Sequence, residues 1–271
     1  MSTHEHNRRA WDRLVAQGDR FCRPASDDDF RQPLAWLDAD GWLGPSVRGQ
    51  RLLCLAAGGG KHGPLYAAAG AEVTVVDISA AQLALDRQVA AERGLSLKLV
   101  QSSMDDLDGL AAASYDVVIH PVSTCYVPDL RAVYRAVARV VRPGGLYISQ
   151  HKQPASLQAG SQPGPNGYAI ETAYYHRDPL PPVVGSLHRE PGTLEFLHRW
   201  EDLLGGLCLA GFAIEDLKEP CHAQPGAETG SFSHRSQFVP PYVRIKARRT
   251  GQAGSTGQSG STGPAAGLVL P

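Results

Sequence analysis

The sequence predicts an α/β fold in which a doubly wound, mostly parallel sheet carries helices on both faces. From residue 51 onwards, short apolar and β-branched runs alternate with segments of helical periodicity, the order typical of a parallel sheet. The first run, LLCLA at 52–56, is apolar at every position, as expected of a strand buried on both faces. A cluster of glycines follows it at once. These observations predict one α/β domain over residues 51–249.

Seven strands are expected in this domain, with the last one antiparallel. The predicted strands cover residues 51–56, 72–77, 96–101, 115–120, 146–150, 212–219 and 241–249. The predicted helices cover residues 61–69, 79–93, 129–141 and 193–210. The helix at 129–141 has the clearest pattern, because its apolar residues recur every three or four positions and Asp129 is a favourable N-cap. The sequence RPGG at 142–145 is expected to end this helix in a turn.

Residues 1–50 precede the alternating pattern and are expected to form a cap of two helices. The first covers residues 5–17, and the second starts at the acidic stretch 26–29 and continues through Leu37. Trp11 and Trp36 lie on these helices, where an aromatic side chain suits either packing or a ligand contact.

Two other segments also depart from the pattern. Residues 153–193 are interrupted by prolines and glycines, and we interpret them as an insertion that forms either a lid over a binding site or a surface feature. Within them, the aromatic stretch 169–178 suits a strand or one arm of a hairpin. The Gly/Ser/Thr-rich tail, 250–271, is expected to be disordered, because it has too few apolar residues to order itself.

The residues around the first strand predict a nucleotide-cofactor site. Gly58, Gly59 and Gly60 permit a tight turn and a close approach of a ligand to the backbone, and the helix that follows directs its free N–H groups toward that ligand. Asp77 ends the second strand, 19 residues after Gly58. A carboxylate there can accept hydrogen bonds from ribose hydroxyls, or it can cap the helix that starts near Ser79. Dinucleotides and S-adenosylmethionine both suit this geometry.

Composition narrows the class of partner and the compartment. The chain has 26 basic and 27 acidic residues, so no broad basic surface is expected and nucleic acid is not a predicted partner. Its five cysteines show no paired or metal-ligand spacing, which favours a reducing compartment and predicts no metal site. The polar N-terminus lacks a signal core, and no apolar run reaches the ~20 residues of a membrane span. We expect a cytoplasmic monomer or homodimer that is not bound to membranes.

The order of motifs resembles a known family. The glycine turn, Asp77, SSMDDL at 102–107, DVVIHPVSTCYVPD at 116–129 and RPGGLYIS at 142–149 resemble the class I S-adenosylmethionine-dependent methyltransferases, in the branch called methyltransferase type 11. The resemblance is strong over 51–150, and RPGG is its most specific piece. It implies a Rossmann-like fold and S-adenosyl-L-methionine as cofactor.

The resemblance also implies roles for individual residues. Ala57, Gly58 and Gly60 would line the methionine and ribose parts of the cofactor, and Asp77 would bind the ribose hydroxyls. Ile78 would pack on the adenine, and Ser103 and Met104 would meet its edge and face. His120, Pro121 and Val122, at the end of strand four, would face the methyl donor and the acceptor. Three positions depart from the family pattern: Cys54 replaces an acid in strand one, Ala56 replaces the first glycine, and Ser103 replaces an acid beside the adenine, where Asp105 could substitute.

Methyl transfer from a sulfonium is an in-line displacement that requires a positioned nucleophile in a dry pocket. A hydroxyl or ammonium acceptor also needs a base, whereas a carboxylate acceptor needs none. His120, at the end of strand four, is the first candidate for the base, because the unperturbed pKa of histidine is about 6.5. His151, just past strand five, is the second candidate, and Tyr126 can supply a hydroxyl or an aromatic wall.

The resulting hypothesis is a methyltransferase that acts on an oxygen, from a hydroxyl or a carboxylate, or on a nitrogen of a small-molecule acceptor. A catalytically inactive S-adenosylmethionine-binding module is one alternative, because the glycine motif is altered. An NAD(P)-dependent oxidoreductase is another, and it would predict a catalytic Tyr/Lys pair or a thiol near the nicotinamide.

Overall fold

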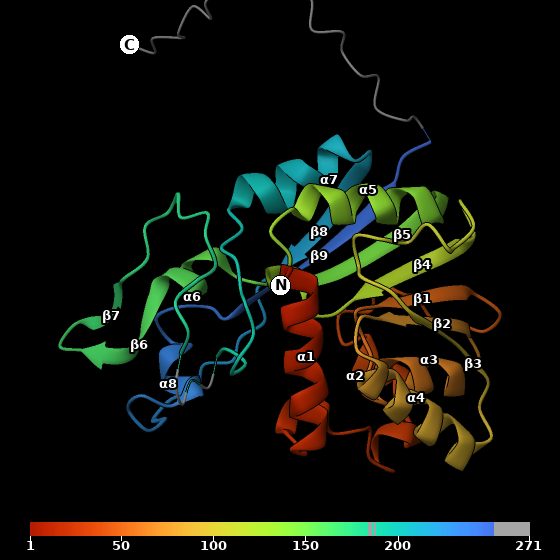
Figure 1. Ribbon diagram of the computed structural model, residues 1–271, viewed down its shortest axis with the longest axis horizontal. Coiled ribbons are helices and arrows are strands. Elements are labelled where there is room, and N and C mark those ends of the chain that lie inside the picture. The colour runs from red at the N-terminus through yellow and green to blue at the C-terminus, as the bar shows by residue number, and fades with distance from the viewer. Residues whose placement is uncertain (184–185, 187, 252–271) are drawn as a thin grey trace, which may run out of the picture.

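A computed structural model describes residues 1–183, 186 and 188–251. Its centre is a seven-stranded sheet with the order β3-β2-β1-β4-β5-β9-β8 (Figure 1). β9 runs antiparallel to both of its neighbours, and the other pairings are parallel, so the predicted Rossmann-like architecture with an antiparallel last strand is confirmed. The strands are β1 (Arg51–Leu55), β2 (Glu72–Asp77), β3 (Leu97–Gln101), β4 (Tyr115–His120), β5 (Val141–Lys152), β8 (Phe212–Lys218) and β9 (Tyr242–Arg249).

Helices cover both faces of the sheet, as Figure 1 shows. On one face lie α2 (Pro33–Leu37), α3 (His62–Ala68) and α4 (Ala80–Arg93), and on the other lie α5 (Leu130–Val140) and α7 (Gly206–Leu209). The apolar stripe of α5 is fully buried, and the Asp129 carboxylate accepts hydrogen bonds from the first-turn backbone N–H groups, as predicted. Among the described residues, no helix combines the length and apolar character that crossing a bilayer requires.

The predicted helix over 193–210 is wrong in its first part. Residues 193–199 have no regular secondary structure, and the helical structure after them includes a π-helical turn, η4 (Glu201–Gly205), that continues into α7. The backbone of 193–199 is bonded to other segments, because Phe196 N–H donates to the Cys125 carbonyl and Leu180 N–H donates to the Glu195 carbonyl. Leu194 and Leu197 fit helical spacing, but tertiary hydrogen bonds decided the conformation.

Two shorter predictions also need correction. The second N-terminal helix is split into a 3-10 turn, η2 (Asp29–Arg31), and α2, because Pro33 disfavours a helical conformation at the residue before it. The RPGG segment is not a separate turn. It belongs to β5, which starts directly after α5 with a bulge against β4, and Gly144 accommodates the bulge at φ +76°.

The N-terminal helix α1 (Thr3–Ala16) connects the two halves of the molecule. The Asn7 amide donates to the Tyr126 and Leu194 carbonyls and accepts from the Leu194 N–H, so α1 is bonded both to the loop after β4 and to the segment 193–199. At the other end of α1, the Ser79 hydroxyl donates to Asp12. In Figure 1, α1 stands in front of the sheet, and residues 154–170, which follow β5, lie to the left of it.

The insertion after β5 contains α6 (Pro154–Gln158) and a hairpin of β6 (Ala159–Gly164) and β7 (Gly167–Ile170). The stretch 169–178 is therefore a strand only as far as Ile170. The buried Arg235 of α8 (Phe232–Arg235) holds this lobe together, because its guanidinium donates to the backbone carbonyls of Ser156, Ala159 and Gly160. The predicted disordered tail falls almost entirely on 252–271, outside the described residues.

We predict that Arg235→Ala lowers the free energy of unfolding by about 3 kcal/mol, because several buried carbonyls lose a charged donor. Urea unfolding measures the change, and hydrogen exchange over residues 154–170 should report local opening. Arg135→Ala is the control, because the Arg135 side chain is 66% exposed; its effect should stay below about 0.5 kcal/mol. An equal effect of the two variants would contradict this role of Arg235.

Candidate functional site

A cavity of about 510 Å³ lies at the carboxyl ends of β1, β2 and β4. Its size falls within the roughly 300–1,000 Å³ of typical small-molecule sites, and this edge of a parallel sheet is where such sites form. Two of the predicted site residues, Gly60 and His151, do not line it. The predicted residues that do line it are Ala57, Gly58, Asp77, Ile78, Ser103, Met104, His120, Pro121, Val122 and Tyr126.

The glycine turn after β1 is held by two buried carboxylates. Gly58 N–H donates to Asp77 and Gly59 N–H donates to Asp86, each at 2.9 Å. Space for a side chain is absent, since a Cβ on Gly58 would lie 2.7 Å from the Gln82 Cβ, and one on Gly59 would lie 2.8 Å from its Oε1. Gly60, at φ +74°, packs instead against Val89 and Pro24, which explains its place outside the cavity.

Ala56 occupies the position where the family pattern has its first glycine. Its φ is +47°, in the left-handed region that favours glycine. The turn therefore keeps the backbone path of a glycine motif with a non-glycine residue at its entrance, at a cost of about 1 kcal/mol.

Asp77 serves the turn and also reaches the cavity. Its Oδ1 accepts from the Ser79 N–H at 2.9 Å, but the cap of α4 is the Ser79 hydroxyl, which accepts from Gln82. The reading of Asp77 as a simple helix cap is therefore insufficient. Burial raises the pKa of Asp77 to about 6, and it raises the pKa of Asp86 to about 7. An ionised carboxylate has about four acceptor positions, so Asp77 can accept further hydrogen bonds from a ligand.

The two candidate histidines have different positions. His120 lines the cavity, its Nδ1 lies 2.7 Å from the Tyr147 hydroxyl, and its buried Nε2 has no hydrogen-bond partner among the described residues. His151 lies behind the cavity, with Nδ1 and Nε2 each 2.8 Å from the hydroxyls of Thr124 and Ser149. Burial lowers the pKa of His120 to about 3 and also lowers the pKa of His151. Both imidazoles are therefore neutral near pH 7.

The residues after β3 are arranged differently from the family pattern. The Ser103 hydroxyl donates to Asp105, and the same carboxylate lies 3.0 Å from the His4 Nε2 of α1. Asp105 itself does not line the cavity, whereas Ser103 and His4 do. Trp11 and Trp36 also line it, so both tryptophans reach the site in addition to packing.

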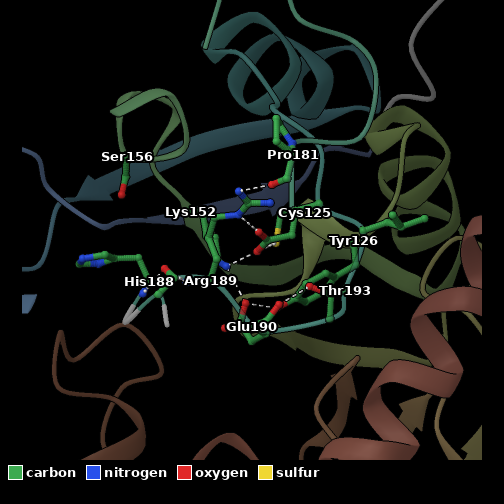
Figure 2. Close-up of polar contacts among 12 residues, drawn as sticks. Cys125, Tyr126, Lys152, Ser156, Pro181, His188, Arg189, Glu190 and Thr193 are labelled. Carbon is green, nitrogen blue, oxygen red and sulfur yellow. Dashed lines mark hydrogen bonds and ion pairs between the residues drawn. The ribbon is translucent and has the colours of Figure 1, made fainter. Parts of the chain in front are cut away.

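Sequence reasoning missed the carboxylate of Glu190, which also lines the cavity. The Tyr126 hydroxyl and the Lys152 ammonium both donate to its Oε2 at 2.6 Å, as Figure 2 shows. Lys152 also pairs with Glu195, which in turn pairs with Arg189. The only sequence signal was Glu195 itself, a charged residue between Leu194 and Phe196 in an otherwise apolar run. No pattern pointed to Glu190.

Comparisons with known proteins identify the family. The family model described as "Methyltransferase domain" matches residues 53–149. The uncharacterized methyltransferase YbaJ of Bacillus subtilis is 34% identical over 229 residues, which cover 79% of this chain and 89% of that protein. The chain belongs to the class I S-adenosylmethionine-dependent methyltransferases. Its cofactor is therefore S-adenosyl-L-methionine, and the NAD(P)-dependent alternative is set aside.

Two further proteins are similar to this chain, one over part of its length and one in its fold. A ubiquinone biosynthesis O-methyltransferase of Cronobacter sakazakii is 38% identical over 97 residues, which cover 36% of this methyltransferase and 40% of that protein. The crystal structure of an S-adenosylmethionine-dependent methyltransferase from Mesorhizobium loti superposes with a TM-score of 0.63 at 23% identity, covering 81% of this chain and 100% of the other. That structure supports the fold alone.

The cavity of this methyltransferase fits the cofactor. Backbone without side chains is available at Gly58, apolar side chains are available at Ile78 and Met104, and two buried polar atoms at the cavity, Gln82 Oε1 and His120 Nε2, lack partners among the described residues. The described residues contain no group of three or more His, Cys, Asp or Glu side chains placed to hold a metal ion.

We predict that the His120 imidazole stays neutral from pH 8 to pH 5, because its pKa is lowered to about 3 by burial. Nitrogen chemical shifts of ¹⁵N-labelled histidine should be constant for His120 over this range, with its signal assigned by its absence from His120→Asn. A midpoint near 6.5 would show that the side chain is hydrated, contrary to its position in the structure.

Proposed function

We propose that this enzyme transfers the methyl group of S-adenosylmethionine to an oxygen or nitrogen of a small-molecule acceptor. One observation carries the proposal: the glycine turn, Asp77 and the free Nε2 of His120 line one cavity that also extends to Tyr126 and Glu190. One cavity can therefore receive both a cofactor and an acceptor.

We assign the cofactor to the sheet side of the cavity. In this assignment Ala57 and Gly58 contact the methionine and ribose parts, Asp77 accepts hydrogen bonds from the ribose hydroxyls, and Ile78 packs on the adenine with Ser103 and Met104 at its edge and face. Gly60 acts indirectly by shaping the turn. When bound, the cofactor supplies an electrophilic methyl group on a positively charged sulfur.

The residues around the acceptor then have to orient it and exclude water. His120 and Pro121, at the end of β4, are proposed to lie beside the reacting atoms. A pKa of about 3 makes His120 a weak proton acceptor, so its Nε2 is better suited to orient the acceptor by a hydrogen bond than to remove a proton. Tyr126 forms an aromatic wall with Trp11, whose ring centroid lies 5.5 Å away. We assign His151 a positioning role through Ser149.

We further propose that the enzyme is a cytoplasmic monomer or homodimer that does not bind nucleic acid or membranes. Its net charge of −1 supports this, since phosphate backbones and anionic lipid surfaces attract basic proteins. The domain division 1–50, 51–249 and 250–271, with 153–193 as an insertion, is likewise a proposal. Figure 1 supports it by placing α1 apart from the sheet.

The first prediction of this proposal concerns the cofactor. Calorimetry should show that S-adenosylhomocysteine binds the wild type more tightly at pH 8 than at pH 5, because Asp77, with a pKa of about 6, is ionised only at the higher pH. Asp77→Asn should weaken binding at pH 8 by roughly tenfold, the effect of a lost charged hydrogen bond. Asp108→Asn is the control, because the Asp108 side chain is 94% exposed. Unchanged affinity in Asp77→Asn would remove Asp77 from the ribose.

The second prediction concerns turnover. Radiolabelled methyl transfer to a panel of hydroxyl, amine and carboxylate small molecules should identify an acceptor. With that acceptor, His120→Ala should reduce kcat at least about tenfold while changing S-adenosylhomocysteine affinity less than about threefold, since one orienting hydrogen bond is lost. Cofactor binding without transfer to any acceptor would favour the inactive binding module instead.

A further inference from the structure

Glu190 is a buried carboxylate at the cavity that the assigned roles do not use. It is 8% exposed, and it comes from the part of the chain after β5, far in sequence from the cofactor motifs. Both side-chain donors that reach it, the Tyr126 hydroxyl and the Lys152 ammonium, bind the same oxygen, Oε2. Within the described residues no other side chain donates to Oε1. The Glu190 backbone N–H also acts on this carboxylate through a hydrogen bond. The two carboxylate oxygens offer about four acceptor positions, so the group can still accept a hydrogen bond from a ligand.

The surrounding charges keep this carboxylate ionised. Although burial acts to raise the pKa of Glu190, the neighbouring Lys152 and the Tyr126 hydroxyl lower it overall. Lys152 remains a cation, because Cys125, Glu190 and Glu195 outweigh the effect of burial and raise its pKa. An ionised carboxylate can only accept hydrogen bonds. It therefore selects ligand groups that carry an N–H or O–H, and it repels a second carboxylate.

The other cations that line the cavity are not placed to attract a carboxylate to Glu190. The Arg244 guanidinium is paired with Asp40 at 2.9 Å. Lys61 directly follows the glycine turn, and the segment that contains Arg23 is held near this turn in space, because Ala25 N–H donates to the Gly60 carbonyl. Both therefore belong to the cofactor end of the cavity.

A second observation supports an occupant at the acceptor end. The Nε2 of His120, a residue only 1% exposed, is buried without a partner among the described residues, and His120 lines the same cavity. An unpaired buried polar atom costs free energy unless a ligand satisfies it. Aromatic side chains of Trp11, Tyr126 and Tyr242 also line the cavity, and they suit a flat or cationic acceptor.

We propose that Glu190 binds the methyl acceptor through a hydroxyl or amino group, so that the acceptors are alcohols, phenols or amines and not carboxylic acids. This inference rests on the proposed function and narrows it. It makes Glu190 a residue that determines acceptor class and contacts the substrate directly, with Tyr126 and Lys152 as the residues that position it.

The test measures binding of matched aromatic probes to the protein saturated with S-adenosylhomocysteine, by ligand-observed NMR. The probes are benzyl alcohol, benzylamine and benzoate, with the corresponding naphthalene and indole sets. In the wild type, the amine and alcohol members should bind at least about tenfold more tightly than the carboxylates. Glu190→Gln, which keeps the shape and removes the charge, should reduce this preference to about threefold or less.

Glu195→Gln is the matched control. It removes the same charge from the same buried cluster, but Glu195 is 0% exposed and does not line the cavity. It should keep the wild-type preference. An equal loss of preference in both variants would show that the whole cluster, and not contact with Glu190, sets the selection, and it would overturn the proposal.

The outcomes separate this inference from the proposed function. Failure of the wild type to bind S-adenosylhomocysteine would overturn the proposed function. Cofactor binding combined with equal affinity for amine and carboxylate probes, or with no binding of any alcohol or amine probe, would overturn the role of Glu190 alone. The comparison of amine, alcohol and carboxylate probes on the wild type needs no variant, so it tests the predicted preference even where Glu190→Gln fails to fold.

Discussion

The geometry of the site depends on how the turn between β1 and α3 is fixed. Two backbone N–H groups of the glycine turn donate to carboxylates from β2 and α4, and these carboxylates are themselves buried. Each acid needs a donor to be tolerated in the interior, and each N–H needs an acceptor, so the turn and the acids stabilise one another. Asp77 is thus committed to the fold and is also positioned for a ligand at the end of β2.

The part of the cavity wall that lies at the strand ends could be predicted from the sequence because its parts are local. Gly58 lies in the turn after β1, whereas Asp77 and His120 end β2 and β4, and parallel strands bring their carboxyl ends to one edge. The place of Glu190 in the cavity could not be predicted this way. Glu190 precedes the segment 193–199, which is not helical and is bonded to Asn7 and Cys125, and periodicity does not encode such long-range contacts. The same contacts explain why the predicted helix there was wrong.

Residue type alone was also a limited guide to chemistry. His120 and His151 have the same side chain and similar places at strand ends, but only His120 lines the cavity. His151 has both ring nitrogens bonded to buried hydroxyls, and burial lowers the pKa of both residues. The sequence predicted a general base with a pKa near that of free histidine, whereas burial in the structure makes both imidazoles weak proton acceptors. Burial, which depends on the whole fold, decides between these roles.

The buried cluster of Lys152, Arg189, Glu190 and Glu195 constrains how this enzyme family can diverge. Two cations face two carboxylates, so the loss of any one charge leaves an uncompensated charge in the interior. Relatives that change one of these positions should therefore change a second one of opposite sign. Lys152 ends β5, whereas the other three residues lie far from it in the sequence. Such paired changes would therefore make substitutions in the sheet depend on substitutions in the later segment. Diversification of acceptors would then proceed by compensated pairs rather than by single substitutions.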